Sequence, residues 1–491
     1  MSTGGMQMAQ AGQEVLAEGP SETTEAFARD AELAQFGYKQ ELKRSLSLTQ
    51  LTAYGLNYMV PIGPAIIFGT MLVISGGTVV LPFAIAGVMC FFTALSYGTM
   101  VQNYPLAGSA FTYVSRGWNV HVGFVAGWIL ILCYVFIPSL VGMALSRYAA
   151  SYHTGIPYEV WVFIFVGVMG AINLLGVDVM AKLGLVFLVI GEFVIFVGFG
   201  VWTWAAHRKG ISLIQAAPFH FRSVGALMTA TSVAVLLYLG YDAVTTLAEE
   251  AKNPQRDVPK AVYLSVLVSG VTMVLTGYLA MLLIPDWKVL SNDPNWVATT
   301  LFEVGKRANN TWFPIFYMAG IFISFSVFVV VATSAGARLL YGMGRDGLLP
   351  RKVFGAINKR FQTPHFNILT IIVLELIICT WSNVETISSL VDFGALGAFL
   401  ALNVSVIWLY YVRGQGISGY RSGNTPLHRP TGVGFLRYFV CPLIGACVVG
   451  WVLMSMDRKT LIIGSSWAAI GIIYECILTR GWRRLPPKLE L

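Results

Sequence analysis

The chain has 491 residues, of which 56% are hydrophobic and only 11% are charged, and its formal net charge is +8. A soluble protein carries roughly 25% charged residues, so this chain lacks the polar surface that a water-exposed fold requires. Its basic residues stand singly between apolar runs, which excludes the continuous basic surface of a nucleic-acid-binding protein. The composition therefore predicts an all-α polytopic membrane protein.

The chain begins with a polar segment, residues 1–45, that lacks the apolar stretch of a cleaved signal peptide. We expect it to be a disordered cytoplasmic tail. From residue 46 onward, apolar runs of the length that a bilayer requires recur between polar segments. They predict about twelve membrane spans, at 47–75, 79–101, 121–146, 159–177, 182–206, 223–249, 262–284, 312–337, 365–382, 385–412, 437–455 and 461–479.

The basic residues predict the orientation of these spans. With the N-terminus inside, 23 of the 32 Lys and Arg residues fall on the inner side of the membrane and 9 on the outer side. Because Lys and Arg are enriched in cytoplasmic segments, both termini are expected in the cytoplasm. We therefore expect a multi-pass protein of the cell inner membrane that ends in a short cytoplasmic tail, residues 480–491.

Two of the predicted spans contain a helix break. Pro61 and Pro64 interrupt the first span around Ile62 and Gly63, and Gly240 interrupts the sixth. A single proline kink is common in membrane helices for packing reasons, but these interruptions lie five spans apart. That spacing predicts two five-helix repeats of inverted topology around a midplane site, at 46–206 and 223–412, followed by two further helices at 437–479.

Three strings in the chain resemble conserved segments of one transporter superfamily. GYDAVTTLAEEAKNPQRDVPKA, at 240–261, is similar to the helix-six signature of the amino acid, polyamine and organocation transporters. ARLLYGMGRDGLLP, at 337–350, resembles the segment after helix eight, and NYPLAGSAFTYVSRGWN, at 103–119, resembles the loop between helices two and three. The strings stand in family order, and the run LGYDAVTTLAEE looks most like the bacterial putrescine importers.

The resemblance implies a secondary transporter that imports a small amine or polyamine by alternating access, coupled to protons and without a cofactor or metal. An amino acid permease of the same superfamily is the alternative. A membrane-embedded enzyme, a sensor and a channel are further alternatives, although no metal-ligand or nucleophile cluster stands out. The expected partners are the amine or amino acid, protons and the lipid bilayer, but no nucleic acid, and the chain is expected to be a monomer or homodimer.

The broken helices suggest how a ligand is held. A break frees N–H groups at one helix end, which suit an anion, and carbonyls at the other, which suit a cation. In amino acid transporters of this superfamily the first break is usually a Gly-Ser-Gly-like run, whereas here Pro64 removes one donor. This favours a ligand held by its amine, near the carbonyls of Leu237 and Tyr238 and the carboxylate of Asp242. The predicted ligand-binding residues are Ile62, Gly63, Cys133, Tyr134, Leu237, Tyr238, Gly240, Tyr241 and Asp242.

By the same resemblance, Tyr238 stands where the superfamily often places an aromatic gate, and Asp242 where it places a proton-responsive acid. Tyr134 matches a position that lines the site of putrescine importers. Those importers tend to carry acids where this chain has Cys133 and Ile66. A diamine would then find fewer counter-charges, so a monoamine or an amino acid stays open as the ligand.

Glu192 is a second carboxylate at membrane depth, about 15 Å into the fifth span. It stands beside Gly191, which occupies the position where sodium-independent relatives often place a protonatable residue. We expect Glu192 and Asp242 to share proton coupling. The alternative is that Glu192 is neutral and hydrogen-bonded between helices. At the cytoplasmic side, salt bridges that latch the loops are expected from Glu249, Glu250, Lys252, Arg256, Lys260, Arg345 and Asp346. The alternative is that these charges are solvated.

Overall fold

The computed structural model describes residues 41–152, 155–309, 311–358, 360–382, 384–413, 430–456 and 458–482. All elements discussed below lie in the compact unit that runs from Arg44 to Glu490. Residues 1–40 and 483–491, which make up most of the two predicted tails, lie outside the described residues. Within the described ranges the secondary structure is helical, apart from one isolated bridge between Leu46 and Ala251.

The described residues contain nine helices of membrane-crossing length and apolarity, one bent helix pair, and two shorter apolar helices. Together they coincide with the twelve predicted spans and confirm the predicted fold class. In chain order the spans are α3 (Leu48–Met59) with α4 (Pro64–Ser75); α5 (Val80–Asn103); α7 (Val120–Tyr152); α8 (Tyr158–Leu174); α9 (Val177–Arg208); α10 (Val224–Val235) with η2 (Leu236–Tyr238) and η3 (Asp242–Glu250); α11 (Pro254–Leu282); α14 (Phe313–Arg345); α16 (His365–Trp381); α17 (Val384–Ile407) with η4 (Trp408–Val412); α18 (Val433–Phe435), η5 (Leu436–Val440) and α19 (Cys441–Met454); and α20 (Arg458–Leu478). The shorter elements between them are α6 (Ser109–Gly117), η1 (Ala217–Phe219), α12 (Trp287–Leu290), α13 (Pro294–Ala308) and α15 (Arg351–Phe354).

Two spans extend beyond their predicted bounds at polar ends. The seventh was expected from residue 262, but α11 begins at Pro254, and the eighth was expected to end at 337, but α14 continues to Arg345. Proline suits the first turn of a helix, where its missing N–H would have no partner within the helix. Hydropathy marks only the apolar part of a span, so it misses turns that carry charged residues.

The first span is broken where the prolines predict it. α3 ends at Met59, Val60 has a left-handed φ of 45°, and α4 starts at Pro64 with Gly63 as its cap. The two helices meet at an angle of 50°. Because Pro61 and Pro64 donate no N–H, a continuous helix would lose two hydrogen bonds in this stretch.

The sixth span is broken at Gly240. The α-helical part ends at Val235, and after η2 the chain passes through Gly240 with a φ of +122° before η3 begins at Asp242. The two breaks are in contact, because a Cβ added to Gly240 would lie 2.0 Å from the ring of Tyr58 in α3. A Cβ on Gly63 would likewise lie 2.9 Å from the side chain of Leu237.

This contact predicts the effect of Gly240→Ala. Alanine at a φ of +122° is strained, and its methyl group would overlap the Tyr58 ring. We expect the free energy of unfolding to fall by about 1–3 kcal/mol, measured as a lower midpoint of thermal unfolding in detergent. Gly225→Ala in the same span is the matched control, because its nearest neighbour is 4.0 Å away. A Gly240→Ala protein as stable as that control would contradict the prediction.

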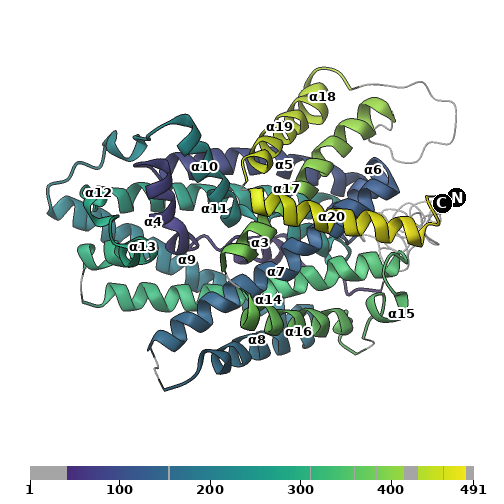
Figure 1. Ribbon diagram of the computed structural model, residues 1–491, viewed down its shortest axis with the longest axis horizontal. Helices are drawn as coiled ribbons and strands as arrows, with labels where there is room; N and C mark the ends of the chain where they lie inside the picture. The colour runs from purple at the N-terminus through teal and green to yellow at the C-terminus, as the bar shows by residue number, and fades with distance from the viewer. Residues whose placement is uncertain are drawn as a thin grey trace, which may run out of the picture. The chain divides into compact units, whose positions relative to one another are not determined.

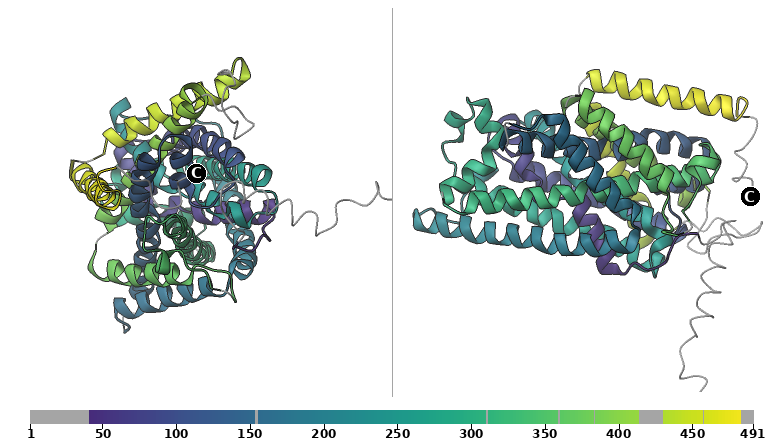
Figure 2. Two further views of the ribbon diagram at one scale, coloured as in Figure 1. Left: turned by 90° about the vertical axis from the view of Figure 1, so that its right-hand side faces the viewer. Right: turned by 90° about the horizontal axis from the view of Figure 1, so that it is seen from below.

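The helix ends gather at two ends of the bundle. At the end that we call inner, the N–H of Ser45 donates to the carbonyl of Glu250. At the outer end, the N–H of Arg222 donates to the carbonyl of Ser75. Between the ends, α7 packs against α14 and α17, and α5 against α11 (Figure 1). α20 lies along the outside of the bundle, and only 17% of its most apolar stretch is buried (Figure 2).

Candidate functional site

Asp242 is buried where the two helix breaks meet. The hydroxyl of Tyr134, in α7, donates to its Oδ2 at 2.5 Å, and the N–H of Gly240 donates to its Oδ1 at 3.2 Å. The hydroxyl of Ser109 lies 3.2 Å from that of Tyr134. Since both oxygens of Asp242 accept hydrogen bonds, the site is arranged for an ionised carboxylate. A proton or an ammonium group that approaches it changes these bonds directly.

Aromatic rings surround this carboxylate. The ring of Tyr241 lies 6.0 Å from that of Tyr97 and 5.4 Å from that of Phe399 in α17. On the other side, the ring of Tyr58 lies 6.1 Å from that of Tyr134 and 5.3 Å from that of Phe328 in α14. These residues come from six different spans, so the network joins both broken helices to α5, α7, α14 and α17.

A cavity of about 620 Å³ extends from the breaks toward the outer end of the bundle. It is formed by α4, α7, α10, η2, α14, α17 and the end of α19, with the first break at its base. Its lining residues are Tyr58, Met59, Val60, Gly63, Ile66, Ile67, Thr70, Ile137, Leu140, Val141, Ala144, Thr229, Ser232, Val233, Leu236, Leu237, Phe325, Phe328, Ser388, Ser389, Asp392, Leu396, Val452, Ser455 and Met456. This lining contains no Lys, Arg or His, and Asp392 is its one carboxylate.

The amide end of the first break has little capacity left for an anion. The N–H of Gly63 donates to the carbonyl of Val60 at 2.6 Å, and that of Ala65 donates to Ile62 at 3.1 Å. Pro64 has no N–H. The structure therefore agrees with the expectation that a ligand carboxylate would be weakly held here.

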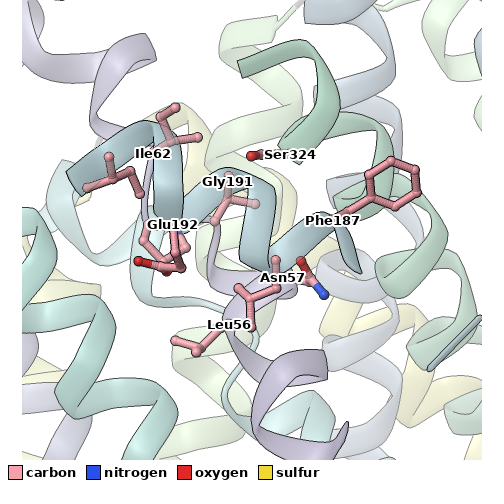
Figure 3. A pocket seen from close by; sticks show the side chains of 11 residues that line it. Leu56, Asn57, Ile62, Phe187, Gly191, Glu192 and Ser324 are labelled. Carbon is pink, nitrogen blue, oxygen red and sulfur yellow. The ribbon is translucent and has the colours of Figure 1, made fainter. Parts of the chain in front are cut away.

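Glu192 faces the first break from the other side. It lines a small pocket of about 10 Å³ between α9 and the first break, together with Asn57, Ile62 and Ser324 (Figure 3). Its Oε1 is buried without a hydrogen-bond partner among the described residues. Asn57 donates to the carbonyl of Gly184 at 2.8 Å and so holds α3 against α9. A change in the charge of Glu192 would act directly on the break.

The inner end is closed by two buried ion pairs between η3 and α14. Arg345 donates to both carboxylate oxygens of Glu249 at 3.0 and 2.9 Å, and the N–H of Ala107 donates to Glu249 at 2.9 Å. Arg338 donates to both oxygens of Glu250. The cavity thus lies outward of the breaks, while ion pairs hold the inner half of the sixth span in place. We call this arrangement, with the cavity on the outer side of the breaks and ion pairs across the inner end, the outward-facing conformation.

The structure places eight of the nine predicted ligand residues at three locations. Gly63 and Leu237 line the cavity, and Ile62 lines the small pocket beside Glu192. Tyr134, Gly240, Tyr241 and Asp242 form the network inward of Tyr58, with Cys133 buried beside Tyr134.

Tyr238, the predicted gate, does not line the cavity in this conformation. Its hydroxyl donates to the carbonyl of Phe83 in α5, and its ring lies against Gly87 and Gly270. The aromatic residue at the base of the cavity is Tyr58, which the sequence analysis did not single out. Its position three residues before Pro61 was the available signal, because the last turn before a break faces the site.

Asp392 was also missed. It lies in α17, within the predicted span 385–412, and its Oδ1 is buried without a hydrogen-bond partner among the described residues. An ionisable residue within a membrane span marks a functional site by default. That rule, applied to this span as it was to the sixth, would have identified it.

The comparisons with known proteins agree with this architecture. Residues 59–480 match the family described as amino acid permease. The chain is 30% identical to the low-affinity putrescine importer PlaP of Escherichia coli over 460 residues, which cover 92% of this chain and 97% of that protein. It is 24% identical to the branched-chain amino acid permease BcaP of Bacillus subtilis, over 91% and 95% of the two chains. It is 26% identical to the methylthioribose transporter of the same organism, over 90% and 94%.

Proposed function

Because the chain belongs to the amino acid permease family, we propose that it imports a small amine by proton-coupled alternating access. It is a multi-pass membrane transporter. The observation that supports an amine is the environment of Asp242, where the two breaks are in contact. This carboxylate accepts hydrogen bonds from Tyr134 and Gly240, as an ionised group would. Neither of these donors among the described residues is a cationic side chain. A ligand ammonium would supply the missing positive charge.

The features around Asp242 support the same ligand. The first break offers few free amides for a ligand carboxylate, and the cavity that leads to it carries no basic side chain. Its apolar lining suits a hydrocarbon chain, while Tyr58 and Phe328 present aromatic faces to a cation, each worth about 0.5–2 kcal/mol. The similarity to a putrescine importer agrees with this ligand class.

Proton coupling is assigned to Asp242 and Glu192. Each carboxyl group lies beside one of the helix breaks. Protonation of that group therefore changes the free energy of the conformation seen here relative to the other conformations of the transport cycle. A proton biases one orientation only to the extent that it binds the two orientations differently. The hydrogen bond from Tyr134 joins Asp242 to α7, and the bond from Gly240 spans the break of the sixth span, so a proton on Asp242 would alter both.

The alternative ligand is an amino acid with an apolar side chain. The similarity to a branched-chain amino acid permease and the many Ile, Leu and Val side chains in the cavity favour it. Such a ligand places its carboxylate at the first break, where the amides of Gly63 and Ala65 already donate to the chain.

The expected cellular setting follows from the Lys and Arg distribution. We place the protein in the cell inner membrane with both termini in the cytoplasm, so that the ion-paired inner end faces the cytoplasm and the cavity faces outward. We expect the protein to act as a monomer or a homodimer.

Uptake into proteoliposomes tests the proposed function. We expect saturable uptake of 1,4-diaminobutane or a monoamine that increases when the outside is made acidic and that disappears with a protonophore. Leucine is measured in parallel as the amino acid ligand, and protein-free liposomes are the control. Uptake of leucine alone would contradict an amine substrate, and uptake that neither saturates nor responds to the gradient would contradict a coupled transporter.

A further inference from the structure

The cavity contains a carboxylate that the proposed mechanism does not use. Asp392 lines it together with Ser388 and Ser389 from the same helix, and its Oδ1 is shielded from solvent without a hydrogen-bond partner in the described part of the chain. No Lys, Arg or His is present among the 25 residues that line the cavity. A carboxylate in such surroundings is costly unless a cation or a proton neutralises it. The chain does not supply this cation from the cavity lining.

The position of Asp392 relative to Asp242 follows from α17. Asp392 and Phe399 are seven residues apart and lie on one face of that helix, so Asp392 lies about 10 Å further outward. The ring of Phe399 packs 5.4 Å from that of Tyr241, which precedes Asp242. Two residues after Asp392, a Cβ added to Gly394 would lie 2.8 Å from the backbone nitrogen of Cys133, which precedes Tyr134. Asp392 thus lies further outward on the helix that packs against the neighbours of Asp242.

We propose that Asp392 binds the second ammonium group of a linear diamine whose first ammonium group binds at Asp242. This inference rests on the proposed function and names its substrate class. The sequence predicted too few counter-charges for a diamine, since Cys133 and Ile66 occupy positions where acids were expected. Asp392 supplies the missing charge from a different helix.

The dimensions fit a short diamine. A chain of four methylenes separates its nitrogens by five bonds of about 1.5 Å, or roughly 6 Å along the extended chain. One charge-assisted hydrogen bond of about 2.8 Å at each end extends this reach to roughly 12 Å, comparable with the separation along α17. Ile137, Leu236 and Leu237 line the cavity beside the methylene chain.

The same charge disfavours other ligands. A monoamine leaves Asp392 without a cation, and an α-amino acid brings a carboxylate into a cavity that already contains one. Tyr58 separates the cavity from Asp242 in this conformation, because its ring lies against Gly240. Binding at both acids therefore requires the Tyr58 ring to turn aside.

Binding of 1,4-diaminobutane and n-butylamine to the purified full-length protein tests the proposal, since these ligands differ by one ammonium group. We expect wild-type protein to bind the diamine at least tenfold more tightly. Asp392→Asn should weaken diamine binding at least tenfold and change butylamine binding less than threefold. Asp392→Ser, which matches the neighbouring serines, is a second variant in case the first does not fold. Glu303→Gln removes a half-buried outer carboxylate that pairs with Lys306, and both affinities should stay at wild-type values.

Three outcomes would overturn the inference. Equal losses for both amines would show that Asp392 maintains the structure, and an unchanged diamine preference would show that it does not contact the ligand. A variant that keeps the preference but loses the response of uptake to pH would make Asp392 a proton site. All three leave the proposed amine transport intact. If the wild-type protein binds neither amine, the proposed function fails, and this inference fails with it.

Discussion

Asp242→Asn is expected to abolish the accumulation of amine driven by a pH gradient while leaving exchange of amine across the membrane. With one proton per amine, a gradient of one pH unit drives up to about tenfold accumulation in the wild-type protein, because each unit corresponds to about 1.4 kcal/mol. Asparagine has the size of aspartate but binds no proton, so the variant should equilibrate amine without concentrating it. Proteoliposomes at zero membrane potential, with labelled 1,4-diaminobutane, measure both activities.

The physical reason lies in the hydrogen bonds of Asp242. Its two oxygens accept from Tyr134 and from Gly240. An asparagine side chain presents one oxygen and one NH₂ group, so it keeps the bond from Gly240 only if its NH₂ group faces Tyr134, whose hydroxyl must then accept instead of donate. We therefore expect slower exchange as well. The local packing should be preserved, because the two side chains have nearly the same volume.

Glu375→Gln is the matched control for this variant. Glu375 is also a buried carboxylate within a span, but it accepts a hydrogen bond from Thr333 at 2.6 Å and lines neither the cavity nor the small pocket beside Glu192. The Glu375→Gln protein should accumulate amine as the wild-type protein does. Full accumulation by Asp242→Asn would remove Asp242 from proton coupling, and loss in both variants would indicate a general effect of buried carboxylates on folding.

Arg345→Gln is expected to open the inner end. The change removes a cationic partner from Glu249, and both side chains are buried. Loss of one partner from a buried ion pair typically costs about 3–5 kcal/mol. Because the pair joins η3 to α14, that free energy is lost from the closed conformation and shifts the population toward the inward-open one. Transport should slow, since the return to the outward-facing state requires the pair to form again.

The opening can be measured by the reactivity of a cysteine introduced at position 107 in a cysteine-free background. Ala107 is fully buried, and its N–H donates to Glu249 behind the ion pair. A membrane-impermeant thiol reagent applied from the inner side should label it at least tenfold faster when Arg345 is replaced.

Two further variants separate the ion pair from unspecific destabilisation. The double variant Glu249→Gln with Arg345→Gln should be labelled more slowly than the Arg345 single variant, because position 249 then carries no buried charge that has lost Arg345 as its partner. Lys306→Gln disrupts an exposed pair with Glu303, worth no more than about 1 kcal/mol, and should not change labelling. Equal labelling of the single variant and the wild type would mean that this pair does not hold the inner end closed.

The sequence by itself determined the spans and the two breaks. Span positions follow from runs of apolar residues as long as the bilayer is thick, and that property is local. The breaks follow from Pro61, Pro64 and Gly240, because a missing N–H and a positive φ interrupt a helix whatever packs around it. Asp242 could also be identified from the sequence, since a carboxylate within an apolar span is evident without knowledge of the fold.

Only the tertiary structure decided which side chains face the cavity. In a membrane helix the faces toward lipid and toward the protein are both apolar, so hydrophobic periodicity does not reveal the inward face. Tyr238 and Tyr58 are equally plausible as aromatic gates in the sequence, yet one packs between α5 and α11 and the other forms the base of the cavity. Asp392, 150 residues from Asp242 in the chain, lines the cavity because α17 packs on α7, a long-range contact that no local pattern encodes.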